Sequence, residues 1–164
     1  MYFEMFPSML YTLDDGVSAQ VVQDILRRVK FSDELKSNNA FFDQYDIKDG
    51  ETPEMVALRF YRDPQYHWVV LLANDIVDPR FDWPMTQTNL VEYCKTKYGD
   101  SSLYSTHHYV NAAGYEVNSN DPEAASVSNF QYEDEINESK RRIKILKGEV
   151  VSEVVSNFET LINQ

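Results

Sequence analysis

The segment from Tyr45 to Pro84 sets the framework of the chain, because its prolines and apolar residues divide it into short elements that must pack together. It contains both tryptophans, four of the six prolines and the longest apolar run, Trp68–Ala73. That run is far too short to cross a bilayer. It is apolar nearly all round, which is typical of a helix buried on several sides.

Turn and capping residues give the boundaries within this segment. Gly50 follows Asp49 in a turn. Thr52 is a good N-cap, and Pro53 suits the first helical position. The predicted elements are a strand over 41–48, a helix from 52 to about 61 and a helix over 65–73.

The N-terminal region is predicted to form an aromatic segment followed by a helix. The first thirteen residues are aromatic and carry few charges, so we expect them to be buried either on their own domain or on a neighbouring protein. Ser18 is a candidate cap for a helix that runs to about Lys30. The apolar residues expected on one face of that helix are Val21, Val22, Ile25, Leu26 and Val29.

The C-terminal half alternates helices with short strands, so the expected fold class is α+β. The last helix is the most regular amphipathic segment, and it suits either packing on its own core or lying on a partner. The predicted elements are a helix over 88–98, a β-hairpin from 104–111 and 115–118, a polar loop over 118–129, a helix over 132–141, a strand over 142–146 and a helix over 149–162.

The acidic composition narrows the choice of partners. The 164 residues carry a net charge of −12. Nucleic acids and anionic membrane surfaces are therefore poor partners, since both need clustered Lys and Arg. A basic protein surface is a better match. The single cysteine excludes an intrachain disulfide, and the opening residues do not resemble a signal peptide.

The sequence offers no catalytic or metal-binding pattern. The three histidines are His67, His107 and His108, and adjacent residues on a strand point to opposite faces, so the last two could not grip one ion together. Cys94 falls on a helix stripe and is expected in the core. The five glycines include no pair at phosphate-loop spacing. We therefore expect no enzyme activity, no cofactor and no metal.

The central segment resembles a LysM domain, a small βααβ unit. The matching residues are Tyr45, Gly50, Thr52, Tyr61, Trp68, Leu72 and Asn74. LysM domains bind N-acetylglucosamine polymers, so the resemblance implies a peptidoglycan-binding module as an alternative function. The chain departs from the pattern after Ile76, where Pro79, Phe81 and Trp83 replace the usual second strand. The segment 142–146 could supply that strand.

This variant resembles the baseplate wedge protein of contractile-tailed, T-even-like phages, a family with a LysM-like core. Three blocks carry the resemblance: 61–83, the hairpin around 108–116, and 137–145 continuing into the terminal helix. The resemblance implies a structural protein of the virion, in the tail baseplate, assembled in the host cytoplasm. Its implied partners are other wedge proteins, including the wedge core bundle and a sheath-initiator-like subunit, in six copies per baseplate.

These observations predict four segments and a set of interface residues. The segments are an aromatic arm and helix (1–40), the LysM-like core (41–84, completed by 142–146), a helix and hairpin (85–130) and a C-terminal helix-strand-helix (131–164). The interface candidates are Tyr2, Phe3, Phe6, Tyr11, Phe81, Trp83, Val151, Val155, Phe158 and Ile162. Two alternative functions remain: a glycan-binding module and, after it, an enzyme that degrades cell walls. Deleting either 1–13 or 149–164 is expected to block wedge or baseplate formation while leaving the central domain folded.

Overall fold

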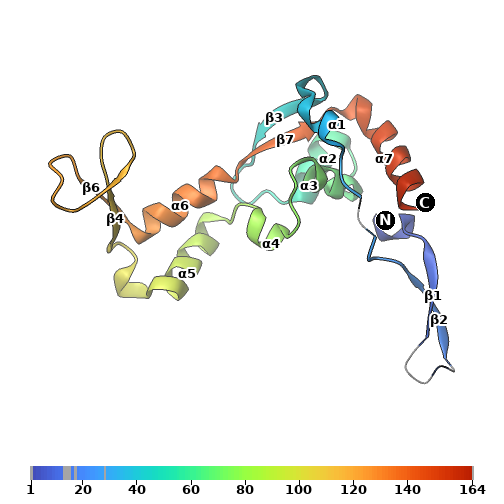
Figure 1. Cartoon of the computed structure of the whole chain (residues 1–164), viewed down its shortest axis with the longest axis horizontal. Coiled ribbons are helices and arrows are strands. Elements are labelled where there is room, and N and C mark those ends of the chain that lie inside the picture. Colours follow the sequence, from blue (N-terminus) through green and yellow to red (C-terminus); the bar gives the residue numbers. More distant parts are fainter. Residues whose placement is uncertain (1, 13–15, 17, 28, 164) are drawn as a thin grey trace. The chain divides into compact units, whose positions relative to one another are not determined.

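The computed structural model describes residues 2–12, 16, 18–27 and 29–163, and it shows an α+β protein, as predicted (Figure 1). The chain forms two compact units. Unit 1 contains residues 1–45, 51–79 and 143–164, and unit 2 contains residues 46–50 and 80–142. Each unit is therefore assembled from segments that lie far apart in the sequence.

Unit 1 is a small α+β body with a hairpin. Its elements are η1 (Tyr2–Met5), β1 (Ser8–Thr12), β2 (Ala19–Gln23), α1 (Asp33–Ser37), η2 (Asn39–Phe41), β3 (Phe42–Asp46), α2 (Pro53–Tyr61), η3 (Pro64–Tyr66), α3 (His67–Ala73), β7 (Arg142–Leu146) and α7 (Gly148–Ile162). The strands β3 and β7 pair in one sheet, although about a hundred residues separate them. The Lys147 N–H donates to the Phe41 carbonyl at one end, and the Ile47 N–H donates to the Arg141 carbonyl at the other, so the pair is antiparallel.

The core of unit 1 draws its side chains from the beginning, middle and end of the chain. Trp68 of α3 and Phe158 of α7 lie at its centre, with 4.5 Å between their ring centroids. The buried cluster comprises Phe6, Phe31, Phe42, Trp68, Val69, Ala73, Leu146, Val151, Val154, Phe158 and Ile162. Because four members belong to α7, this helix packs on its own core. Deleting residues 149–164, or residues 1–13 with Phe6, is therefore expected to destabilise this core, contrary to the prediction from the sequence.

The predicted helix from 18 to 30 is wrong, because β2 occupies residues Ala19–Gln23 and pairs antiparallel with β1. Met9 lies opposite Val22, and Leu10 lies opposite Val21. Two adjacent valines fit a pleated strand better than a helix, and the facing strand supplies their backbone partners. Asp14 and Asp15 lie outside the described residues, and Gly16 has φ +66°.

Unit 2 combines three α-helices, one of them only four residues long, with a small sheet. Its elements are α4 (Pro79–Asp82), α5 (Gln87–Tyr98), η4 (Asp100–Ser102), β4 (Thr106–Val110), β5 (Glu116–Val117), β6 (Ala125–Ser128) and α6 (Asn129–Ser139). The strand order is β5-β4-β6, with antiparallel pairs. The predicted hairpin is confirmed as β4–β5. The predicted loop over 118–129 is wrong in its last residues, since β6 pairs with β4 there.

One hydrophobic cluster of unit 2 lies between α5 and the segment that follows it. Leu90, Cys94 and Leu103 are buried, and Met85, Tyr98 and Phe130 pack against them. Cys94 is thus in the core, as its helical spacing predicted. Its burial raises the pKa of the thiol, and the negative charge of Glu133 adds to the rise.

Candidate protein interaction sites

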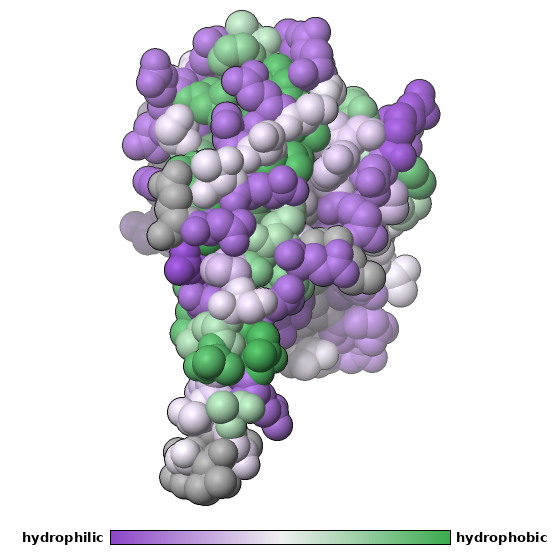
Figure 2. Space-filling view, turned by 90° about the vertical axis from the view of Figure 1, so that its right-hand side faces the viewer, coloured by the Kyte–Doolittle hydropathy of each residue, from purple (hydrophilic) through white to green (hydrophobic). Residues whose placement is uncertain are grey.

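The β1–β2 hairpin is the most exposed apolar structure in unit 1. Every residue of β1 is exposed, and so is every residue of β2 except Val22, which is partly buried. Leu10 and Val21 face each other across the strands with 72% and 71% of their surfaces accessible. Figure 2 shows hydrophobic surface on the strands of this projecting hairpin.

The two strands of the hairpin carry no charge, and in the described part of the chain no third strand pairs with their outer edges. They read SMLYT and AQVVQ and form a two-stranded sheet. Protruding edges in soluble proteins usually carry charges, prolines or covering elements that discourage pairing. An isolated two-stranded hairpin is also marginally stable in water. These properties are typical of a strand pair that is completed by another surface.

The root of the hairpin is fastened to unit 1. The Asp24 N–H donates to the Pro7 carbonyl at 2.8 Å, which extends the strand pairing by one bond. The Arg27 side chain donates to the carbonyl of Ile162 at the end of α7 at 2.9 Å, and also pairs with Asp24 at 3.1 Å. The hairpin is therefore held at its base while its strands remain accessible.

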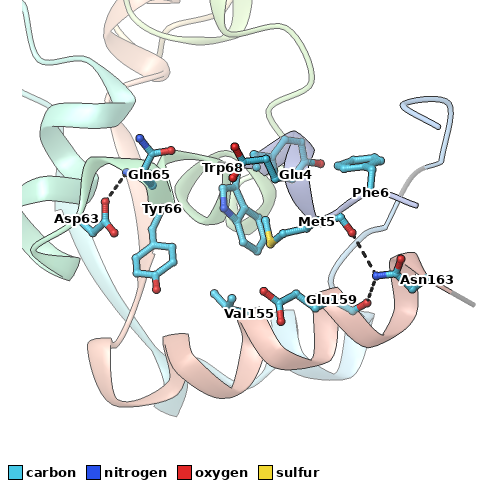
Figure 3. Close-up of a pocket in the computed structure, with 11 residues that line it drawn as sticks. Glu4, Met5, Phe6, Asp63, Gln65, Tyr66, Trp68, Val155, Glu159 and Asn163 are labelled. Carbon is cyan, nitrogen blue, oxygen red and sulfur yellow. Dashed lines mark hydrogen bonds between the residues drawn. The ribbon is translucent and has the colours of Figure 1, made fainter. Parts of the chain in front are cut away.

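An open pocket of about 610 Å³ lies beside this root (Figure 3). Its walls come from η1, from η3 with the start of α3, and from α7. The Asn163 amide closes one end by donating to the carbonyls of Met5 and Glu159, at 3.2 and 2.7 Å. The described lining residues are Tyr2, Glu4, Met5, Phe6, Asp63, Gln65, Tyr66, Trp68, Val155, Glu159 and Asn163.

The residues chosen for the LysM resemblance have defined structural roles. The Thr52 hydroxyl caps α2 by accepting from the Met55 N–H, and Gly50 has φ +78°, a left-handed conformation that glycine adopts without strain. The Tyr45 hydroxyl donates to Glu51 at 2.6 Å and accepts from Arg59 at 2.8 Å. Burial raises the pKa of Tyr45, and Glu51 raises it further.

Asn74 fastens α3 to β7. Its amide group donates to the carbonyls of Val70 at 2.9 Å and Lys144 at 2.8 Å, and its oxygen accepts from the Lys144 N–H at 2.8 Å. The side chain therefore pairs with β7 as a backbone peptide would. Trp68 is buried in the core, where Tyr61 and Leu72 pack against the same cluster. Burial raises the pKa of Tyr61 above its ordinary range.

The interface candidates divide into buried and accessible side chains. Phe6, Trp83, Val151, Phe158 and Ile162 are buried within the chain, which leaves them little surface for a partner. Tyr2 and Val155 are partly buried and line the pocket of unit 1. Phe3, Tyr11 and Phe81 are exposed. The sequence analysis missed Leu10, Val21 and Leu26, although Asp15-Gly16 between two apolar runs is a hairpin signal that would have found them.

Unit 2 contains buried polar side chains that the sequence did not single out. The Asn137 amide oxygen accepts from the Met85 N–H at 2.7 Å, and its nitrogen donates to the Met85 carbonyl at 3.1 Å. Asn129 donates to the Ser102 carbonyl at 2.8 Å. Hydrogen-bonded polar groups of this kind fix the segments that they join, because leaving them unpaired is costly.

Glu133 lies at the centre of a charged cluster in unit 2. Its carboxylate accepts from Lys97 and from the Tyr98 hydroxyl, each at 2.7 Å. Burial acts to raise the pKa of Glu133, but the hydrogen bonds from Lys97 and Tyr98 outweigh it and hold the pKa below the usual value. The same hydrogen bond raises the pKa of Lys97. Both groups are therefore charged near neutral pH.

The side chains of His107 and His108 on β4 of unit 2 lie next to each other, so the prediction that they point to opposite faces is wrong; the β4–β6 register is irregular between Thr106 and His108. His107 stacks on Tyr132 with 4.1 Å between ring centroids, and its Nδ1 lies 2.9 Å from that of His108. Within the described ranges, no three His, Cys, Asp or Glu side chains converge as a metal site would require. None of the helices in the described part of the chain combines the length and apolar character needed to cross a membrane.

Known proteins similar to this chain come from phage tails. The family described as base plate wedge protein 53 matches residues 1–123. A similar protein is the baseplate wedge protein gp53 of Enterobacteria phage T4, which is 28% identical over 111 residues. That match covers 58% of this chain and 57% of the T4 protein, so the chain spans little more than half the length of its relative. Since the family match extends over three quarters of the sequence, the chain belongs to the base plate wedge protein 53 family.

Proposed function

We propose that this chain joins wedge subunits, and neighbouring wedges, in the inner baseplate of a phage tail, and that the β1–β2 hairpin is its main docking element. Membership of a baseplate wedge family supports the structural role. We infer the docking element from a hairpin that is held to unit 1 at its base and whose uncharged strands are exposed on both faces. The partner completes this sheet or covers its faces, as in strand addition.

The specific partners follow from the family resemblance. Within this proposal they are other wedge proteins, including the wedge core bundle and a sheath-initiator-like subunit, and six copies are arranged as a ring. The chain acts without catalysis, and assembly precedes release of the virion from the host cytoplasm. The acidic surface favours basic neighbours.

The proposal is tested by complementing a phage that lacks this protein with variants of the hairpin. Leu10→Thr combined with Val21→Thr keeps a β-forming residue at both positions but removes apolar surface. We expect the variant chain to be lost from purified tails, and infectivity to fall with it. Mass spectrometry of tails and plaque counts measure the two effects.

Gln20→Thr combined with Gln23→Thr is the matched control, because it makes the same substitution on polar positions of β2. We expect normal incorporation for this control. The melting temperatures of both double variants should match that of the wild type, since none of the four side chains belongs to the core. Normal tails from the Leu10/Val21 variant would show that the hairpin is not the docking element.

The peptidoglycan-binding alternative has less support. The resemblance rests partly on Asn74 and Trp68, and both side chains are engaged within unit 1. Sedimentation with purified peptidoglycan separates the two functions. Micromolar binding that is lost on Asn74→Ala, in a variant that stays folded, would favour the glycan-binding alternative.

A further inference from the structure

The charged side chains among the described lining residues of the unit 1 pocket are all acidic. Among its described lining residues, three are acidic and none is a lysine, arginine or histidine. Glu4 comes from η1, Asp63 from the start of η3 and Glu159 from α7. These three elements are distant in sequence, so the fold brings their carboxylates to one cavity.

The carboxylates differ in the hydrogen bonds that they already accept within the chain. Asp63 caps η3, since its oxygen accepts from the Gln65 N–H at 2.8 Å. Within the described part of the chain, no hydrogen bond or ion pair engages the Glu159 carboxylate. Figure 3 shows this side chain between α7 and the Trp68 ring. Glu159 is therefore the anion best placed to meet an incoming group.

Aromatic and aliphatic side chains complete the walls. Tyr2 lies against Trp68 with 5.4 Å between ring centroids, and Tyr66, Met5 and Val155 line the same space. A long side chain with an aliphatic stem and a cationic end suits such a cavity. The stem packs on apolar walls, and the cation is attracted both by carboxylates and by aromatic faces. A small apolar ligand would offer no charge to the Glu159 carboxylate.

We propose that this pocket binds a lysine or arginine side chain from a basic segment of a partner protein, with its charge beside Glu159 and its stem against Tyr2 and Val155. The inference rests on the proposed baseplate role, because it names the chemistry of a neighbour in that assembly. The pocket adjoins the docking hairpin along the chain, since Phe6 lines it and β1 begins at Ser8. One partner can therefore reach both.

The test uses the full chain and three capped tripeptides, acetyl-Gly-X-Gly-amide, in which X is arginine, citrulline or glutamate. Citrulline has nearly the shape of arginine but no charge. NMR follows the indole N–H of Trp68 and the backbone amides of α7. We expect the arginine peptide alone to shift these signals, with the weak, millimolar affinity of a single side chain, and the response to fall with added salt.

Two variants on the same helix locate the binding. Glu159→Gln removes the charge and keeps the shape, and we expect it to weaken arginine binding about two- to fivefold, as for an exposed ion pair. Glu153→Gln, which is exposed on α7 outside the pocket, should bind as the wild type does. Equal responses to arginine and citrulline, equal effects of the two variants, or no response at about 10 mM arginine peptide would each overturn the proposal.

These measurements use the free protein, so they are independent of incorporation into tails. Failure of arginine binding with normal hairpin dependence would remove only the pocket proposal. Arginine binding in a chain whose hairpin variants still assemble would contradict the docking element and leave the pocket as a separate contact.

Discussion

The interiors of unit 1 and unit 2 contain different kinds of buried side chains. The main cluster of unit 1 is apolar and rich in aromatic rings, with Phe6, Trp68 and Phe158 from three distant segments. Four polar residues are buried in the described part of the chain, and three of them, Asn129, Glu133 and Asn137, belong to unit 2. Each of these three has a hydrogen-bond partner within that unit.

This difference predicts how the stability of each unit responds to substitution of a buried side chain. An apolar core loses stability in proportion to the contacts and volume removed, and neighbouring side chains can partly fill the space. A buried hydrogen-bonded group instead leaves its partner unpaired when it is removed. The two tryptophans allow each unit to be followed separately, because Trp68 lies in unit 1 and Trp83 in unit 2. Fluorine NMR of fluorotryptophan-labelled protein gives one signal for each.

The largest effect is expected for Phe158→Ala in unit 1. The ring contacts Trp68 and lies 5.5 Å from Tyr2, and it is almost fully buried. We expect a loss of about 3–5 kcal/mol in the free energy of unfolding, from lost burial and a residual cavity. Denaturant titration followed by the Trp68 signal measures it. Phe158→Leu should cost about 1–1.5 kcal/mol. Equal losses for the two substitutions would show that the core has no such cavity cost.

Asn137→Ala tests the polar interior of unit 2. The change leaves both backbone groups of Met85 without their partner, so we expect a loss of about 2–3 kcal/mol, seen in the Trp83 signal. Asn89→Ala, at an exposed position of α5, is the matched control and should change stability by less than about 0.5 kcal/mol. Similar values for the two variants would mean that unit 2 does not depend on its buried amide.

Asn74→Ala tests a polar contact within unit 1, whose main core is apolar. Three hydrogen bonds are lost, but the side chain is only partly buried, so water can replace some of them. We expect a loss of about 1–2 kcal/mol, measured with the Trp68 signal. Asn157→Ala on the exposed face of α7 should be neutral. A loss as large as that of Phe158→Ala would mean that unit 1 also depends chiefly on polar contacts.

Glu133→Gln should have the smallest effect, about 1 kcal/mol near neutral pH, and this effect should depend on pH. Because the folded-state pKa of Glu133 lies below the ordinary value, the unfolded state binds more protons between the two values. The stabilisation is therefore full above the ordinary glutamate pKa of about 4.3. It is lost as the pH falls through the lower folded-state pKa.

Denaturation at a series of pH values measures this difference between wild type and variant. The difference should stay constant from about pH 7 to about pH 5 and shrink in more acidic solution. Glu135→Gln, at an exposed position of α6, controls for a general change in net charge. A wild-type advantage that grows in acid would contradict the charged Lys97–Glu133 pair.

Elements with strong local signals could be predicted from the sequence. The Thr52-Pro53 start of α2, the apolar run of α3 and the amphipathic pattern of α7 depend on capping and periodicity, which act within a few residues. The β4–β5 hairpin also has a turn between two short strands. In each case the local preference and the final structure agree.

The errors fall where a partner strand decides between two local possibilities. Residues 19–23 carry apolar residues at spacings compatible with a helix, but β1 lies opposite all five of them and pairs with them as a strand. The strand β6 reads ASVS, with two exposed and two partly buried residues; this alternation is too short to distinguish a strand from a loop, and pairing with β4 defines it. The exposed face of the β1–β2 hairpin was missed because residues 19–23 were predicted as part of a helix.

The sequence alone determined the α+β class, the positions of the main helices and the family, because these depend on local patterns and on residues in a recognisable order. The tertiary structure decided which surfaces remain for partners. It placed Val151, Phe158 and Ile162 inside unit 1 and left Leu10 and Val21 outside. It also brought Glu4, Asp63 and Glu159 to one pocket. Burial and convergence depend on contacts between distant segments, which no local pattern specifies.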